Sequence, residues 1–195
     1  PNFIMHVSAS TIHAGLNSDT KVPVGDPGEA QERGAVAISC QINLGSNNEG
    51  EMIRDAGLLT SAALAHDMPV LGMIYPRGPG LIPIEGDKTK GVAHAARLAW
   101  ELGCHVAKVP WTGSADSFHD VCSSVPIPVL IAGGQPNTSF AQTLKIVESA
   151  ISVGGAGVCM GRQIFGAHDR IDRIRALRAI IHEGKTSNEA IQMMG

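Results

Sequence analysis

The sequence predicts an α/β protein, a (β/α)8 TIM barrel, and three observations lead to that expectation. Short β-rich runs recur with a mean spacing of about 30 residues, the length of one βα unit. Segments with the hydrophobic spacing of helices stand between most of these runs, and such alternation forms parallel sheets. Aromatic residues make up only 4% of the chain and glycines number 23, a composition typical of helices packed closely on parallel strands.

The predicted elements follow one another in a regular order. Strand runs span residues 3–8, 35–44, 69–75, 105–110, 128–132 and 156–160. Helical segments span residues 51–66, 91–102, 140–153 and 172–182. Ser46 and Glu49 have the spacing of a capping box for the first of these helices, and Gly103 and Gly154 stand where helices end.

Six βα units do not close an eight-stranded barrel. Two further units at the same period would bring the chain to about 255 residues, near the roughly 250 of that fold. The sequence also opens with Pro1, directly before an apolar strand, rather than with Met. We therefore expect residues 1–195 to form a single barrel domain made of strands 3 to 8, with the first two βα units missing from this chain. The first strand would then lack a partner on one side.

Charge and hydropathy exclude several classes of protein. The 15 Lys and Arg residues against 18 Asp and Glu give a net charge of −3, so no nucleic-acid partner is expected. No apolar run approaches the roughly 18 residues that span a bilayer, and the N-terminal residues lack the order of a secretory signal. We therefore expect a cytoplasmic protein without a membrane partner. The four cysteines include no C-x-x-C pair, which favours free thiols over a metal site.

Lys108 is the candidate nucleophile. It lies inside the apolar run at 105–111, where a charged lysine is costly to bury. The alternatives are an edge strand or a side chain that reaches solvent, but helical segments flank this strand on both sides and disfavour an edge position. A desolvated lysine has a lowered pKa and attacks a carbonyl to form a Schiff base.

Tyr75, the only tyrosine, ends the strand run before Pro76 and Arg77. The C-terminal ends of barrel strands face the active site, so its phenol is a candidate for proton transfer. The alternative is a structural tyrosine bonded to a loop carbonyl. Arg77 is a candidate for bidentate binding of an anion, and the alternative is that it simply faces water.

Two consecutive strands end in glycine-containing loops. Gly133 and Gly134 follow one strand, and Gly161 and Arg162 follow the next. After these two strands, (β/α)8 enzymes frequently bind phosphate with backbone amides and a helix N-terminus. Gly-Gly alone is a weak signal because turns use it freely. The two loops together predict a phosphorylated substrate, with Arg162 as a counter-charge.

Polar side chains alternate along the first two strands. His6 and Ser8 share one face of the first strand, and Gln41 and Asn43 share one face of the second. If those faces point into the barrel mouth, the side chains bind substrate hydroxyls. The alternative for each is a polar group satisfied within the core. His6, Ser8 and Asn43 are the candidate substrate-binding residues of this set.

Five motifs, in order along the chain, resemble the archaeal-type class I fructose-bisphosphate aldolases. The resemblance is still closer to their relatives, the 2-amino-3,7-dideoxy-D-threo-hept-6-ulosonate synthases, and it extends over essentially the whole chain. The motifs are MIYPRG at 73–78, VAHAAR at 92–97, Lys108 with WTG at 111–113, IAGG at 131–134 and GRQIF at 161–165.

The resemblance implies a (β/α)8 barrel with a Schiff-base lysine at Lys108, a proton-transferring tyrosine at Tyr75 and phosphate binding by the two glycine loops. It also implies no metal or other cofactor, and a homo-oligomer in the form of a ring, commonly a decamer. Two features of the family have no match here. The synthase branch has a histidine where Gln41 stands, and the family's aspartate after its first strand is not found.

Two functions of different classes follow. The first is a Schiff-base-forming class I aldolase or transaldolase-type enzyme, a carbon–carbon lyase or aldol transferase that acts on a ketose phosphate. Its reaction is that of a fructose-bisphosphate aldolase or of an amino-heptulosonate synthase, including a synthase that joins a triose phosphate to aspartate semialdehyde. The alternative is a non-catalytic phosphometabolite-binding or assembly subunit of the same fold, which the unmatched aspartate and strands favour.

Overall fold

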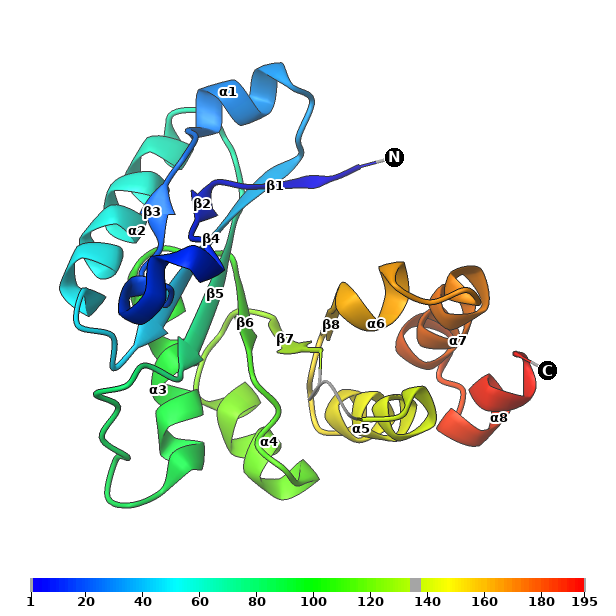
Figure 1. The fold of residues 1–195 in the computed structure, drawn as a ribbon. Helices are drawn as coiled ribbons and strands as arrows, with labels where there is room; N and C mark the ends of the chain where they lie inside the picture. Colours follow the sequence, from blue (N-terminus) through cyan, green and yellow to red (C-terminus); the bar gives the residue numbers. More distant parts are fainter. Residues whose placement is uncertain (1, 134–137, 195) are drawn as a thin grey trace.

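A computed structural model describes residues 2–133 and 138–194 and shows an α/β architecture built on a six-stranded parallel sheet. The strand order is β1-β4-β5-β6-β7-β8, and every neighbouring pair is parallel (Figure 1). The predicted parallel order of the six strand runs is confirmed. The strands are β1 (Ile4–His6), β4 (Ala37–Leu44), β5 (Val70–Pro76), β6 (Val106–Val109), β7 (Val129–Ala132) and β8 (Gly157–Cys159).

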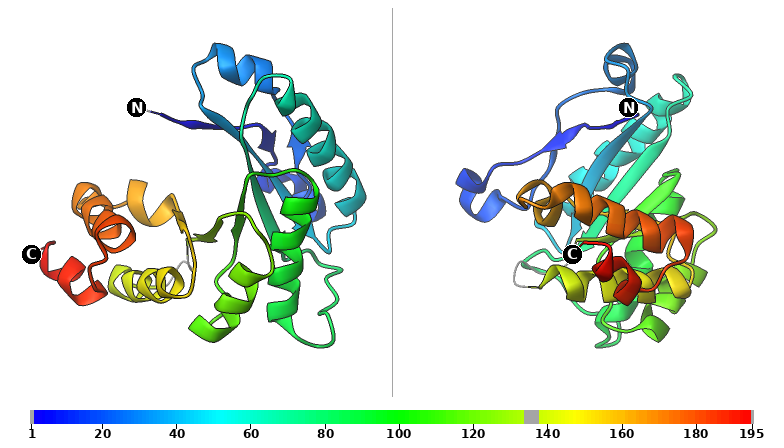
Figure 2. Two further views of the ribbon diagram at one scale, coloured as in Figure 1. Left: turned by 180° about the vertical axis from the view of Figure 1, so that it is seen from behind. Right: turned by 90° about the vertical axis from the view of Figure 1, so that its right-hand side faces the viewer.

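Helices cover the outer face of this curved sheet (Figures 1 and 2). Helix α2 packs on β4, α3 packs on β5 and β6, and α5 packs on β8. The helices are α1 (Pro27–Glu32), α2 (Glu49–Leu64), α3 (Lys88–Glu101), α4 (Ala115–Ser123), α5 (Phe140–Ser152), α6 (Arg162–Phe165), α7 (Arg170–Glu183) and α8 (Ser187–Gln192), with a 3-10 helix η1 (Ile12–Asn17).

The two faces of the sheet differ in chemistry because successive side chains of a strand point to opposite faces. The side chains on the helix-covered face are apolar and fully buried, among them Ile38, Ile42, Ile74, Val109 and Ile131. Their neighbours along the strands lie on the open inner face and include polar groups, such as Gln41, Tyr75 and Lys108. The hydrophobic core therefore lies between the sheet and the helices, and the polar side chains lie on the inner face.

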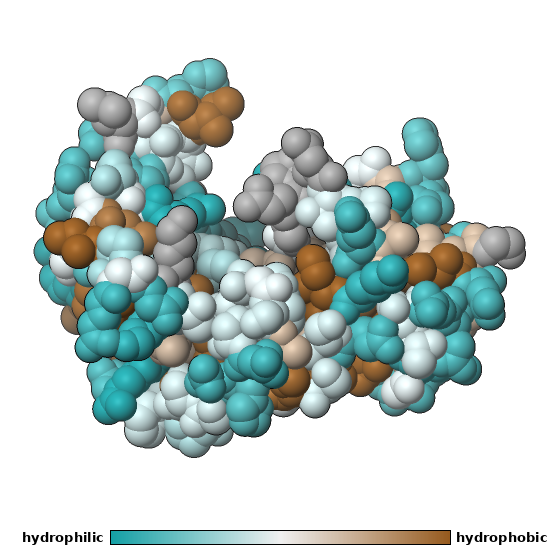
Figure 3. All heavy atoms as spheres, turned by 90° about the horizontal axis from the view of Figure 1, so that it is seen from below, coloured by the Kyte–Doolittle hydropathy of each residue, from teal (hydrophilic) through white to brown (hydrophobic). Residues whose placement is uncertain are grey.

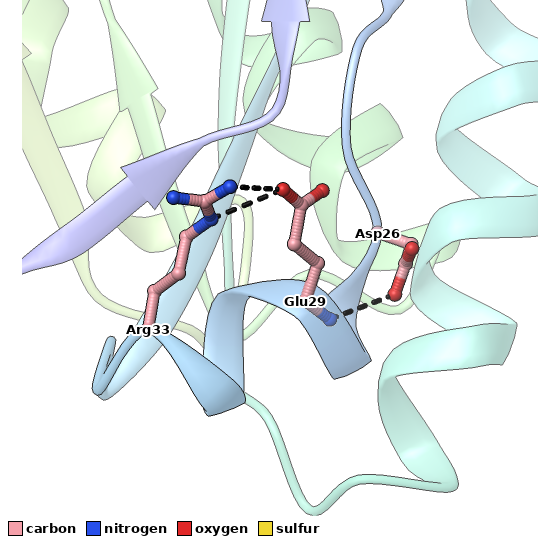
Figure 4. Close-up of polar contacts among 3 residues, drawn as sticks. All are labelled: Asp26, Glu29 and Arg33. Atoms are coloured by element: carbon pink, nitrogen blue, oxygen red, sulfur yellow. Dashed lines mark hydrogen bonds and ion pairs between the residues drawn. The ribbon is translucent and has the colours of Figure 1, made fainter.

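Helix α1 was not predicted from the sequence, and it begins at an N-cap residue, Asp26. The Asp26 side chain accepts a hydrogen bond from the Glu29 amide at 3.0 Å, and Pro27 occupies the first turn (Figure 4). Glu29 also pairs with Arg33 at 2.7 Å, one helical turn later. That pair is solvent-exposed and stabilises the helix by about 0.3–0.5 kcal/mol. The cap thus fixes where this short helix starts.

The capping box predicted from Ser46 and Glu49 is wrong. Helix α2 starts from Asn48, which makes no side-chain cap hydrogen bond, and the Glu49 carboxylate instead accepts a hydrogen bond from the amide of Gly45 in the preceding loop. The predicted helix-ending glycines are confirmed, because Gly103 and Gly154 have φ values of +84° and +103°. A small antiparallel pair, β2 (Ser8–Ala9) with β3 (Val22–Pro23), was not predicted.

Gly72 is expected to be intolerant of any side chain. It lies in β5, and a Cβ there would approach Cys104 Sγ to 2.8 Å and Ala99 Cβ to 3.2 Å, both on buried residues. Gly72→Ala should therefore lower the free energy of unfolding by about 1–3 kcal/mol through overpacking. Urea denaturation measures this free energy of unfolding. Gly57→Ala in helix α2 is the control, since its Cβ would meet nothing closer than 3.9 Å and should stabilise the helix by up to about 1 kcal/mol. Equal effects of both substitutions would contradict this account.

The sheet has two outer edges. Within the described residues β1 pairs with β4 alone and β8 with β7 alone, which matches the expectation that the first strand lacks one partner. Seen from below, hydrophilic residues and residues of intermediate hydropathy cover most of this face, and apolar ones form separate small groups (Figure 3). In the described ranges no helix combines the length and apolarity that crossing a membrane requires.

Candidate active site

A cavity of about 660 Å³ lies at the C-terminal ends of strands β5 to β8. In parallel α/β sheets, this end of the strands is where ligands bind. Six of the ten predicted site residues line it. The lining residues are Tyr75, Arg77, Lys108, Pro110, Trp111, Thr112, Gly113, Ile131, Ala132, Gly133, Thr138, Thr143, Ile146, Cys159, Met160, Gly161, Arg162 and Gln163.

Lys108 lies on an interior strand. Its strand, β6, pairs with β5 on one side and with β7 on the other. In this register Met73 of β5 and Leu130 of β7 lie beside Lys108. The side chain is half-buried on the inner face, and Nζ donates to Met73 Sδ at 3.6 Å. An amine held against a weak thioether acceptor, at the wall of a cavity, is accessible to an electrophile.

Tyr75 stands next to this lysine. Lys108 Nζ lies 5.9 Å from the centroid of the Tyr75 ring, and Arg77 Cζ lies 4.7 Å from the same centroid. The Lys108 amine and the Arg77 guanidinium therefore lie near the same aromatic ring. The structure thus brings together the two residues predicted as catalytic, and Arg77 with them.

The loop that holds Arg77 rests directly on the end of β4. The Gly78 amide donates to Leu44 O at 2.7 Å, and a Cβ at Gly78 would lie only 2.1 Å from the carbonyl carbon of Gly45. Gly45 itself has φ +79°, in the left-handed region that favours glycine. These two glycines let the loops after β4 and β5 meet, and their contact places Arg77 at the cavity.

The opposite end of the cavity is formed by the loops after β7 and β8. Gly133, Gly161 and Arg162 all line it. A Cβ at Gly133 would lie 2.7 Å from Met160 Cβ, so close packing between the two strand ends also requires glycine there. Gly134, the other predicted glycine of this loop, lies outside the described residues.

His6 and Ser8 do not line the cavity. Ser39 Oγ lies 3.0 Å from His6 Nδ1, and Ser8 Oγ lies 3.3 Å from His6 Nε2 and accepts from the Gln41 amide at 3.0 Å. Partial burial lowers the pKa of His6, as do the positive charges of Lys21 and Lys108. Both side chains thus have polar partners within the protein, and Ser8 is buried whereas His6 is exposed. Their binding of substrate stays a prediction.

Asn43 is also absent from the cavity wall, because it is fully buried. Its Oδ1 accepts from Gln41 Nε2 and from Arg77 Nε, each at 2.9 Å, and its Nδ2 donates to the main-chain oxygen of Asp19. The amide oxygen thus accepts two hydrogen bonds and the NH2 group donates one, and Arg77 links Asn43 to the cavity.

Several cavity residues were not predicted as functional. Trp111 follows β6 and packs on Phe118 with ring centroids 5.1 Å apart, while Thr143 donates to Gln163 Oε1 at 2.8 Å between α5 and α6. The sequence could have indicated Trp111, because it lies just after a predicted strand. It gave no signal for Thr143 and Gln163, because their contact joins residues 20 positions apart. Within residues 2–133 and 138–194, no three His, Cys, Asp or Glu side chains gather as metal ligands would.

A parallel barrel-type sheet with a lysine on a central strand, facing a cavity at the strand ends, is an arrangement found among aldolases. The chain belongs to the DeoC/LacD family of aldolases, whose family model matches residues 1–167. The sequence-based assignment to aldolase relatives is thereby confirmed.

Two curated relatives cover nearly the whole chain. A 2-amino-3,7-dideoxy-D-threo-hept-6-ulosonate synthase from Archaeoglobus fulgidus is 36% identical over 192 residues, which are 98% of this chain and 70% of the relative. A 2-amino-4,5-dihydroxy-6-oxo-7-(phosphonooxy)heptanoate synthase from Streptomyces griseus is 34% identical over 190 residues, 97% of this chain and 68% of the relative.

Solved structures of similar fold include archaeal fructose 1,6-bisphosphate aldolases. One matches with a TM-score of 0.86 at 29% identity and covers 94% of this chain and 72% of its own. Another, whose catalytic Lys is covalently bound to the carbinolamine intermediate of the substrate, matches with a TM-score of 0.84 at 28% identity and covers 92% and 71%.

Proposed function

We propose that this protein is a Schiff-base-forming class I aldolase or transaldolase-type enzyme acting on a ketose phosphate. The observation that supports this most strongly is the position of Lys108 on an interior strand, with Tyr75 beside it at the wall of one cavity. The chain is similar to a 2-amino-4,5-dihydroxy-6-oxo-7-(phosphonooxy)heptanoate synthase, to a 2-amino-3,7-dideoxy-D-threo-hept-6-ulosonate synthase and to solved fructose 1,6-bisphosphate aldolases. The same relatives argue against the non-catalytic alternative.

The proposed reaction begins when Lys108 Nζ adds to the substrate's ketone carbon. Loss of water from the carbinolamine gives an iminium ion, which withdraws electrons from the carbon–carbon bond one position removed. The hydroxyl on the far carbon of that bond loses its proton as the bond breaks, and this carbon leaves as an aldehyde. The remaining fragment is an enamine on Lys108. Protonation of the enamine carbon and hydrolysis return the ketone product and the free amine.

Tyr75 is the group we assign to the proton transfers. A phenol is a competent acid or base when it lies within reach of the reacting atoms, and the centroid of the Tyr75 ring lies 5.9 Å from Lys108 Nζ. Arg77, whose Cζ lies 4.7 Å from the centroid of this ring, places a positive charge beside it.

Gly133, Gly161 and Arg162 are proposed to hold the substrate's phosphate. A dianion there would gain charge-assisted hydrogen bonds from backbone amides and from the guanidinium. Arg162→Ala should weaken binding of dihydroxyacetone phosphate by roughly ten- to a hundredfold and leave binding of dihydroxyacetone nearly unchanged. Titration calorimetry on the Lys108→Met background, where no imine forms, measures both. Equal losses for the two ligands would make Arg162 a structural residue.

The six strands are proposed to be strands 3 to 8 of a (β/α)8 barrel in one domain. The parallel order, the helix-covered outer face and the open inner face support this, as does the match to about 70% of longer relatives. We further propose a cytoplasmic homo-oligomer, as the resemblance implies. Size-exclusion chromatography with light scattering measures the oligomer directly.

Aldol cleavage and aldol transfer share the imine steps, so substrates decide between them. Incubation with fructose 1,6-bisphosphate alone tests cleavage, and addition of aspartate semialdehyde tests transfer of the fragment to an amino-acid aldehyde. Triose phosphate release without an acceptor supports the aldolase reaction. A new amino-heptulosonate formed only with the acceptor supports the synthase reaction, and no product in either assay would contradict the proposed function.

A further inference from the structure

Gln163 joins the two helices that border the Arg162 end of the cavity. It lies in α6, directly after Arg162, and it lines the cavity together with Thr143 of α5. Its Oε1 accepts a hydrogen bond from the Thr143 hydroxyl at 2.8 Å, and its Nε2 donates to the main-chain oxygen of Thr138 at 3.4 Å. The side chain of Gln163 therefore ties α6 to the start of α5 at two points.

The direction of these two hydrogen bonds follows from the groups that make them. A main-chain carbonyl only accepts, so the Thr138 oxygen selects the NH2 group of Gln163 and turns Oε1 toward Thr143. The Thr143 hydroxyl also lies 3.2 Å from the main-chain oxygen of Ser139, but it has one hydrogen, and Gln163 Oε1 is the closer acceptor. Thr143 is buried, which keeps bulk water from competing for that hydrogen. The Thr143 hydroxyl is thus the donor that holds Gln163.

The main chain around Gln163 is held as well. Its carbonyl oxygen accepts a hydrogen bond from Arg173 Nη1 of α7 at 2.7 Å. The carbonyl oxygen of Gly161 accepts from two amides further along, at 2.9 and 2.8 Å, so residues 161–165 form one closed turn. Arg162 lies within that turn, between Gly161 and Gln163. A change in how Gln163 is held therefore moves Gly161 and Arg162 with it.

We propose that Thr143 and Gln163 are positioning residues for the substrate's phosphate. The Thr143 hydroxyl holds Gln163, and Gln163 holds the turn that presents Gly161 and Arg162 to the phosphate. A guanidinium forms bidentate hydrogen bonds with a phosphate only in a narrow range of orientations, so a turn that is free to rotate loses affinity. This inference rests on the proposed function. It adds that phosphate affinity depends on a buried hydroxyl of α5, which acts through Gln163 rather than on the ligand.

Two ligands that differ only in a phosphate, dihydroxyacetone phosphate and dihydroxyacetone, test this proposal by titration calorimetry on the Lys108→Met protein. Thr143→Val keeps the shape of the side chain and removes the donor. It should weaken binding of dihydroxyacetone phosphate at least about tenfold and leave binding of dihydroxyacetone unchanged. Thr143→Ser restores the hydroxyl and should retain most of the affinity. Gln163→Ala should have at least the effect of Thr143→Val, and the two together should lose no more than Gln163→Ala alone.

Thr60→Val is the matched control. Thr60 is also a buried threonine within a helix, α2, but its hydroxyl donates to the main-chain oxygen of Gly57 in the same helix at 3.0 Å, away from the cavity. This substitution removes the same hydroxyl from a comparable environment and should change neither affinity. Thermal unfolding reports whether each variant folds. If Thr143→Val does not fold, Gln163→Ala provides the test, because Gln163 is only half-buried.

Four results would overturn the proposal. They are no preference for dihydroxyacetone phosphate in the Lys108→Met protein, no effect of Thr143→Val, equal losses for both ligands as a merely structural residue would give, and an effect of Thr143→Val that persists beside Gln163→Ala. Failure of the proposed function is distinguished separately. It would appear as absence of a borohydride-reduced adduct on Lys108 when the original protein is incubated with dihydroxyacetone phosphate.

Discussion

Replacing Lys108 by Met is expected to lower turnover by roughly 10³-fold or more, because it removes the only atom that forms the imine. The effect should fall on the chemical step. Methionine has a similar length and an apolar end, and it would lie beside Met73, which Lys108 contacts on the neighbouring strand. The fold should therefore be retained, as circular dichroism and thermal unfolding would show.

Lys145→Met is the control for that substitution. Lys145 lies exposed on α5, outside the residues that line the cavity, so its loss should leave turnover unchanged. A steady-state assay of triose phosphate release compares the two variants. Retained turnover in Lys108→Met would remove this lysine from the mechanism.

Replacing Tyr75 by Phe is expected to slow the proton-transfer steps by roughly 10²-fold or more. The ring remains, so the contacts with Arg77 and Lys108 persist and imine formation should continue. Rapid-quench measurements that follow the covalent intermediate and the released aldehyde separately would show accumulation of the first. If both steps lose the same factor, the hydroxyl has a packing role instead.

The strand order was predictable because hydrophobic runs recur at the period of a βα unit. What the sequence did not predict are the elements without such a signal. Strands β2 and β3 have two residues each, too few for alternation to be recognised, and α1 has six. Ser46 and Glu49 had the right spacing for a capping box, but Gly45 offered Glu49 a nearer donor.

The sequence predicted those site residues whose place in the cavity follows from their position along a strand. Lys108, Tyr75 and Arg77 were found in this way, since inner-face residues at strand ends meet at one cavity. The contacts of Asn43 were not predictable. Its place on the inner face of β4 is readable from alternation, but its burial and its bond to Arg77 depend on how two loops meet at Gly45 and Gly78.

Reductive trapping tests the central claim most directly. The protein is incubated with dihydroxyacetone phosphate, reduced with borohydride, digested and analysed by mass spectrometry. We expect one adduct of the reduced triose phosphate, on the peptide that contains Lys108, and none in Lys108→Met. An unmodified Lys108 peptide, or an adduct of equal yield on another lysine, would contradict the assignment of this protein as a Schiff-base aldolase acting through Lys108.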